Sequence, residues 1–183
     1  LIVDPKILFP AEYPYTSGTT KVLRDNFIEL SQEAQSILKI SKDDLVIDIG
    51  SNDGTLLSNF KPVCKVLGIT PEDIGKIAIK NGIPTILDYF TKSVAKDLIK
   101  KYGQAKVVTA NNVFAHINDL DEIVLAVQEL LTDDGVFVSE SHYLLDLIEH
   151  AEFDTIYHEH LCYYSVRPLQ HLFERFGMEV FDV

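Results

Sequence analysis

The order of apolar and polar positions along the chain predicts an α/β fold. Short runs rich in Val, Ile and Leu alternate with longer segments in which apolar residues recur every three or four positions. The short runs are typical of buried parallel strands, and the longer segments are typical of amphipathic helices. Strict alternation of the two predicts a mostly parallel sheet with helices on both faces.

The apolar runs give the expected strands and the segments between them give the expected helices. Strands are expected at residues 45–49, 63–69, 83–87, 105–110 and 136–139, with a sixth beginning at residue 178. Helices are expected at residues 20–40, 71–81, 91–102, 119–131, 143–150 and 167–176. Asp133-Asp134-Gly135 is expected to form a turn before the fifth strand.

The chain divides into an N-terminal arm, residues 1–18, and one domain, residues 19–183. Three prolines and Gly18 interrupt regular structure in the arm. A length of 183 residues is enough for a single domain with a sizeable core. Tyr13 and Tyr15 of the arm are candidates for substrate contact, although simple packing of the arm is the favoured alternative from the residues alone.

Composition excludes some partners. The formal net charge is −12 and no basic run is present, which argues against DNA or RNA as a substrate. No apolar run has the length of a membrane span and nothing typical of a signal peptide opens the chain, so a cytoplasmic location is expected. Cys64 and Cys162 are far apart, which fits a reducing compartment better than a disulfide framework.

The glycine-rich turn after the first strand is the first candidate binding element. It reads Asp48-Ile49-Gly50-Ser51-Asn52-Asp53-Gly54. Gly50 and Gly54 permit positive φ, and the first N–H groups of the next helix can bind a polar or anionic ligand group. The spacing matches neither the G-x-G-x-x-G of dinucleotide enzymes nor a P-loop. An ordinary strand-to-helix turn remains the alternative.

Polar residues at other strand ends extend this candidate site. In open α/β sheets ligands bind at the carboxyl ends of the strands, where residues 70–72, 88–90 and 110–117 are expected to meet the glycine turn. Asn111 and Asn112 directly follow the fourth strand, which favours a binding loop over a packing loop.

The segment Tyr157-His158-Glu159-His160 is the second candidate for chemistry. Histidine suits the role of a general base near neutral pH, and a tyrosine hydroxyl or a second histidine can donate to a developing oxyanion. The same segment permits a zinc site built from His158, His160 and either Cys162 or His142, because His-x-His on an extended strand points both rings to one side. From the residues alone, base and metal ligand remain even alternatives.

Four segments carry a resemblance to a known family: EYPYTSGTT, DIGSNDGTLL, ANNVFAHI and IYHEHLCYYS, in this order. Together they resemble the deoxysugar C-3 methyltransferases, which use S-adenosylmethionine (SAM) to methylate C-3 of a nucleotide-linked 4-keto sugar. The resemblance covers nearly the whole chain. It implies a class I SAM-dependent methyltransferase domain with a Rossmann-like sheet whose seventh strand lies beyond Val183, and further N- and C-terminal domains in the full-length members.

The resemblance also implies roles for individual residues. His160 would be the general base, and the sugar site would be shaped and closed by Tyr157, Glu159, His116 and either Tyr13 or Tyr15. The glycine turn resembles motif I of the class I SAM-dependent methyltransferases, so Asp48, Gly50, Ser51, Asn52 and Gly54 would hold the cofactor, with Thr70 near its ribose. From the residues themselves, Asp88 and Tyr89 are candidates for contact with the adenine, with a strand-end turn as an even alternative, and Asn111 and Asn112 are candidates on the loop after the fourth strand. No metal is expected, because the sulfonium of SAM is already a good leaving group.

Thr70 departs from the family pattern. It stands where an acidic residue usually binds the ribose hydroxyls of the cofactor, so either Glu72 takes this role or cofactor binding is weakened. Two other functions stay open beside a C-methyltransferase acting on a nucleotide-linked keto-deoxysugar or a similar keto substrate. The histidine segment permits a metal-dependent hydrolase that uses His158, His160 and Glu159. Thr70 and the missing seventh strand permit an inactive methyltransferase-like binding domain.

Overall fold

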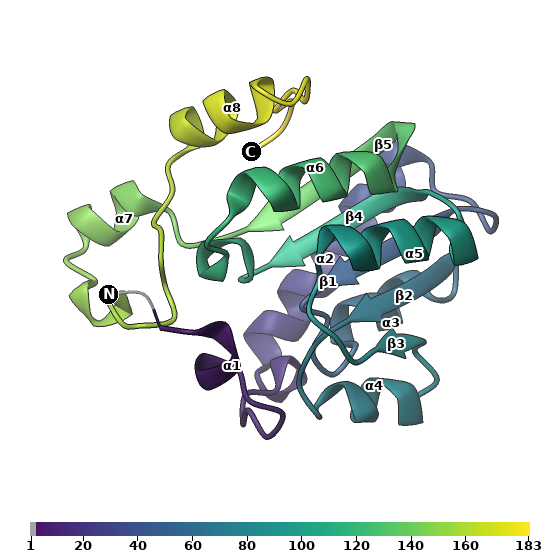
Figure 1. Cartoon of the computed structure of the whole chain (residues 1–183), viewed down its shortest axis with the longest axis horizontal. Helices are drawn as coiled ribbons and strands as arrows, with labels where there is room; N and C mark the ends of the chain where they lie inside the picture. Colours follow the sequence, from purple (N-terminus) through teal and green to yellow (C-terminus); the bar gives the residue numbers. More distant parts are fainter. Residues whose placement is uncertain (1–2) are drawn as a thin grey trace.

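A computed structural model describes residues 3–183, and within them the chain forms a five-stranded parallel sheet of order β3-β2-β1-β4-β5 (Figure 1). The predicted fold class is confirmed. The strands are β1 (Leu45–Ile49), β2 (Lys65–Ile69), β3 (Thr85–Ile86), β4 (Ala105–Asn111) and β5 (Leu131–Glu140).

Helices cover both faces of this sheet. The α-helices of the described residues are α1 (Pro5–Leu8), α2 (Lys21–Leu38), α3 (Thr55–Phe60), α4 (Gly75–Lys80), α5 (Lys92–Tyr102), α6 (Leu120–Leu130), α7 (Leu144–Glu149) and α8 (Val166–Glu174). Helices α2, α3 and α4 pack on one face, whereas α5, α6 and α8 pack on the other. Side-chain caps begin α2, α5 and α6, where Thr20, Thr91 and Asp119 each accept a backbone N–H of the first turn.

Strand β1 is buried along its whole length because helices cover both of its faces. Val46 packs in the cluster with Phe27 and Phe60 on the α2 face. Ile47 packs in the cluster with Leu98 on the opposite face. The two clusters hold β1 in the centre of the domain, so the turn that follows it starts from a rigid base.

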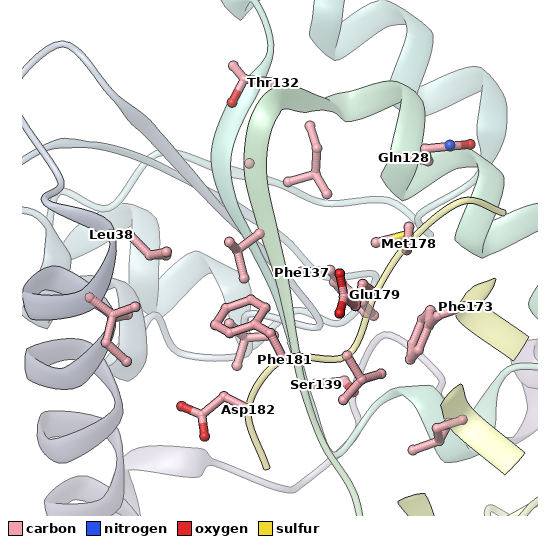
Figure 2. A pocket seen from close by; sticks show the side chains of 18 of the residues that line it. Leu38, Gln128, Thr132, Phe137, Ser139, Phe173, Met178, Glu179, Phe181 and Asp182 are labelled. Atoms are coloured by element: carbon pink, nitrogen blue, oxygen red, sulfur yellow. The ribbon is translucent and has the colours of Figure 1, made fainter. Parts of the chain in front are cut away.

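Two expectations about the end of the sheet are wrong. Residues 178–183 form no strand; they pass beside β5 and help to line a pocket of about 960 Å³ (Figure 2). A strand in a parallel sheet needs cover on both faces, yet Phe181 and Val183 are 61% and 91% exposed. The expected turn at residues 133–135 lies within β5, where the pairing register shifts between Ala105 and Val107.

The segment after β5 leaves the body of the sheet and returns beside the N-terminal arm (Figure 1). Helix α7 begins this excursion, and the Leu144 N–H donates to the Tyr164 carbonyl at 2.7 Å where the chain comes back. No helix within residues 3–183 is long and apolar enough to cross a membrane.

Replacing Phe60 tests the importance of the α2-side core. Phe60 is fully buried, so Phe60→Ala should lower the free energy of unfolding by about 3–5 kcal/mol through lost burial and a cavity. Val22 is 81% exposed, and Val22→Ala should cost about 0.5 kcal/mol or less. Urea denaturation of both variants measures the difference, and similar losses would contradict this packing.

Candidate active site

The turn after β1 is held by the neighbouring strand and by the loop after β4. The N–H groups of Gly50 and Ser51 both donate to the Ile69 carbonyl at the end of β2, at 2.8 and 3.0 Å. Gly50 has φ +73°, and a Cβ at this position would lie 2.2 Å from Val113 Cγ2. Glycine is therefore required here both for backbone conformation and for close contact with the β4 loop.

A cavity of about 540 Å³ opens beside this turn, a size suited to a small-molecule site. Twelve of the residues predicted for the site line it: Tyr13, Tyr15, Gly50, Asn52, Asp88, Tyr89, Asn111, Asn112, His116, Tyr157, Glu159 and His160. The structure thus brings together the arm, the strand ends and the histidine segment, which are far apart in the sequence.

Four predicted binding residues do not line the cavity: Asp48, Ser51, Gly54 and Thr70. The Asp48 carboxylate is buried and accepts the Thr109 hydroxyl at 2.6 Å, and burial raises its pKa to about 7. A Cβ at Gly54 would meet Ala78. Asp48 and Gly54 therefore stabilise the turn from the side that faces away from the cavity.

Thr70 lies behind the cavity wall and Glu72 lies in it. The Thr70 side chain is buried, and its hydroxyl donates to the Glu72 carboxylate. The acidic group at the end of β2 is therefore present, two residues after the expected position. The sequence raised Glu72 only as the substitute for Thr70, because it could not show which side chain points into the site.

The N-terminal arm is fastened over the glycine turn. Asn52 accepts the Ser17 N–H at 2.9 Å and donates to the Tyr15 carbonyl at 3.0 Å. Asp53 accepts the Gly18 N–H at 2.9 Å. Asn52 therefore holds the arm as well as lining the cavity, a role that its position in the turn did not reveal.

Asn111 and Asn112 point to different partners. Both amide atoms of Asn111 are buried and, within the described residues, neither has a hydrogen-bond partner. The Asn112 amide instead donates to Glu140 at 2.8 Å. Buried polar groups are normally paired, so the unpaired amide of Asn111 is suited to a hydrogen bond with a bound ligand.

His160 lies at the centre of a group of aromatic rings. Its ring centroid is 5.1 Å from that of His116, 5.0 Å from that of His142 and 4.4 Å from that of Tyr157. Its Nδ1 lies 2.8 Å from the Thr155 carbonyl, and since a carbonyl only accepts, Nδ1 carries the hydrogen. In the neutral ring Nε2 then has the lone pair, and the Tyr157 hydroxyl donates to it at 3.3 Å.

His116 and Glu159 join this group to the arm. The His116 Nδ1–H donates to the Glu159 carbonyl at 2.7 Å. Burial is the main cause that lowers the pKa of His116, so this ring is neutral at neutral pH. The Tyr13 hydroxyl donates to the Glu159 carboxylate at 2.9 Å, and burial and this carboxylate raise the pKa of Tyr13.

The proposed zinc ligands are not gathered in one place. His158 is exposed and does not line the cavity. Among residues 3–183, no group of three or more His, Cys, Asp and Glu side chains is arranged to hold a metal ion. Phe9 and Val113 also line the cavity and were missed, because apolar residues in an arm or loop give no sequence signal for a binding role.

Residues 17–183 match the family model described as a methyltransferase domain. The chain belongs to this family. The predicted SAM-dependent, class I methyltransferase domain is thereby confirmed at the level of the family.

Comparison with individual proteins agrees with this family. The chain is 33% identical over 184 residues to C-methyltransferase NovU of Streptomyces niveus, covering 100% of this chain and 44% of NovU. The methyltransferase domain thus spans less than half the length of this relative.

Solved structures show the same fold at low identity. A SAM-dependent methyltransferase from Archaeoglobus fulgidus has a TM-score of 0.65 at 17% identity, with 85% of this chain and 72% of that chain covered. The plantazolicin methyltransferase BpumL, solved with a substrate analogue and S-adenosylhomocysteine (SAH), has a TM-score of 0.64 at 15% identity, with 87% and 65% covered.

The residues of this methyltransferase domain fit SAM. The unpartnered amide of Asn111 offers a donor and an acceptor, and the glycine at position 50 keeps side-chain atoms away from the turn. Glu72 offers the carboxylate that ribose hydroxyls require. These three residues come from the ends of β4, β1 and β2, which is where an open α/β sheet binds its ligand.

Gly50→Ala tests the packing of the turn against the β4 loop. The added methyl group would collide with Val113, so SAH affinity should fall about tenfold or more. Val113→Ala in the same protein removes the colliding methyl and should restore part of the affinity. Recovery should be incomplete, because alanine at the positive φ of position 50 still costs about 1–2 kcal/mol. Isothermal titration measures both variants, and full affinity in Gly50→Ala would contradict this arrangement.

Glu72→Gln tests the acidic group at the end of β2. Loss of a charge-assisted acceptor should weaken SAH binding about tenfold. Thr70→Glu should also weaken binding, because a second carboxylate would be buried beside Glu72, even though the family pattern places an acidic residue at this position. Asp73→Asn, at an exposed neighbour, serves as the control in the titration. Tighter binding by Thr70→Glu would show that Thr70, not Glu72, faces the cofactor.

Proposed function

We propose that the domain is a SAM-dependent C-methyltransferase whose acceptor is a keto sugar linked to a nucleotide, with His160 as the general base. The observation that carries this proposal is the position of His160. Its ring, with the hydrogen on Nδ1, lines the same cavity as Gly50 and Asn111. Methylation of a carbon next to a ketone needs a base and a methyl donor at the same carbon, and a base and a SAM site in one cavity meet this requirement.

The chemistry explains why a base is needed. Bound SAM supplies an electrophilic methyl group. A carbon next to a ketone becomes a nucleophile only after it loses a proton, and the lone pair on His160 Nε2 is available to take that proton. The hydrogen bond from Nδ1 to the Thr155 carbonyl stabilises the positive ring that results.

Tyr157 is the candidate donor to the enolate oxygen. Its hydroxyl donates to His160 Nε2 at 3.3 Å in the absence of substrate. As the substrate enters, this hydroxyl turns from Nε2 to the ketone oxygen, which frees the Nε2 lone pair for the proton and places a donor where negative charge develops. Glu159 lies between Tyr157 and His160 in the sequence, and its hydrogen bond with Tyr13 fastens this segment to the N-terminal arm.

The charge of the cavity indicates which part of the substrate it holds. The wall carries the carboxyl groups of Glu72, Asp88 and Glu159, and no lysine or arginine from residues 3–183 lines it. An uncompensated phosphate would be poorly stabilised there. The ring and ketone of the sugar, rather than a diphosphate, are therefore the groups suited to this cavity.

NovU supports the reaction type, since its name records a C-methyltransferase and its identity of 33% extends over the whole chain. The two other functions have less support. The hydrolase needs His158 as a ligand, but that side chain is exposed. The inactive domain was suggested by Thr70 and the missing strand, but Glu72 offers a carboxylate in the cavity wall beside Thr70.

Hydrogen exchange at the carbon to be methylated tests this proposal. With SAH in place of SAM, the full-length protein should exchange the C-3 proton of a nucleotide-linked 4-keto sugar in heavy water. His160→Asn should slow this exchange about 100- to 10,000-fold, the usual contribution of a general base, while SAH affinity stays unchanged. Proton NMR follows the exchange.

The control is His171→Asn, at an exposed histidine on α8, which should exchange at the parental rate. Exchange that survives in His160→Asn would transfer the role of base to His116 or Tyr157. If the parent protein binds SAH but neither exchanges nor methylates the sugar, the proposed acceptor is wrong.

A further inference from the structure

Glu140, the last residue of β5, forms hydrogen bonds with two segments that come from other parts of the chain. One carboxylate oxygen accepts the amide of Asn26 from α2, and the other accepts the amide of Asn112 from the β4 loop, both at 2.8 Å. The Glu140 carbonyl also accepts the Asn112 N–H at 2.8 Å. We propose that Glu140 is a positioning residue that fixes the β4 loop for cofactor binding.

The loop needs such support because its backbone is strained. Asn112 has φ +54°, in the left-handed region that non-glycine residues seldom occupy. Asparagine tolerates this conformation better than most residues, but it still costs free energy. The backbone and side-chain hydrogen bonds to Glu140 together offset this cost and hold Asn112 in place.

The residues on either side of Asn112 connect this support to the site. Asn111 presents its unpartnered amide, and Val113 packs against Gly50 in the turn after β1. A shift at Asn112 would move both neighbours. Glu140 does not line the cavity, so it acts on the site through this loop and not by contact with a ligand.

A carboxylate suits this position because both partners are donors. Each amide NH₂ requires an acceptor, and a carboxylate offers two acceptor oxygens. Alanine at position 140 leaves both amides without their acceptor. Aspartate at position 112 would face the Glu140 carboxylate with no donor between them, whereas glutamine at position 140 would donate to that aspartate and still accept from Asn26. Aspartate tolerates positive φ as asparagine does.

This reasoning defines a test by exchange of donor and acceptor in the full-length protein; it rests on the proposed function, because SAH is the probe. Glu140→Ala should raise the Kd for SAH about tenfold, because both amides lose their acceptor. Asn112→Asp should weaken binding at least as much, since two carboxylates meet. The double variant Glu140→Gln/Asn112→Asp should return to within about threefold of the parent. Glu33→Gln, at an exposed position of α2, is the control.

Amide hydrogen exchange without any ligand gives a second readout. Residues 111–116 should exchange faster in Asn112→Asp and recover in the double variant, because only the loop has been released. If Asn112→Asp does not fold, recovery of folding and SAH binding in the double variant supports the pairing, and failure to recover overturns it.

The outcomes separate this inference from the proposed function. A parent protein that binds no SAH would overturn the proposed function. A parent that binds SAH, with Glu140→Ala folded and its Kd within twofold of the parent value, would overturn the role of Glu140 alone. Weakened single variants without recovery in the double variant would also overturn that role, since the carboxylate would then act by a route other than Asn112.

Discussion

The reversal of strand order between β1 and β4 is the constraint on which the site depends. Helix α3, after β1, packs on the α2 face of the sheet, whereas α6, after β4, packs on the opposite face. The two chain segments therefore diverge as they leave adjacent strands, and a crevice must form between them. Gly50 and Val113 meet at its base, and the cavity opens above them.

The β4 loop also organises the histidine segment, which lies outside the sheet. The Ala115 carbonyl accepts the N–H groups of Leu161 and Cys162 at 2.9 and 3.3 Å. The buried Tyr164 hydroxyl donates to the Phe114 carbonyl at 3.2 Å. One loop therefore carries the asparagines on the turn side of the cavity and anchors the imidazoles on the other side. Because both are attached to this loop, the asparagines and the imidazoles keep fixed positions relative to each other.

The sequence predicted the elements better than the direction of individual side chains. Strand β1 and the amphipathic helices follow from local patterns, and the strand ends that carry the site follow from the parallel topology. Glu72 faces the cavity while the Thr70 hydroxyl donates to it from behind. The pattern of apolar and polar residues does not predict such a hydrogen bond between two side chains. The absent strand at residues 178–183 has a similar cause, since pairing depends on cover from other elements and not on the local run of apolar residues.

The electrostatics of the histidine group link burial to the proposed chemistry. His116 and His160 stack with ring centroids 5.1 Å apart, and each uses Nδ1–H to bind a main-chain carbonyl. A proton that arrives on His160 would be repelled by a positive ring at this distance. Burial lowers the pKa of His116 and keeps this ring neutral, so the repulsion would be absent in the proposed proton transfer to His160. Under that proposal, the burial of His116 favours His160 as the base.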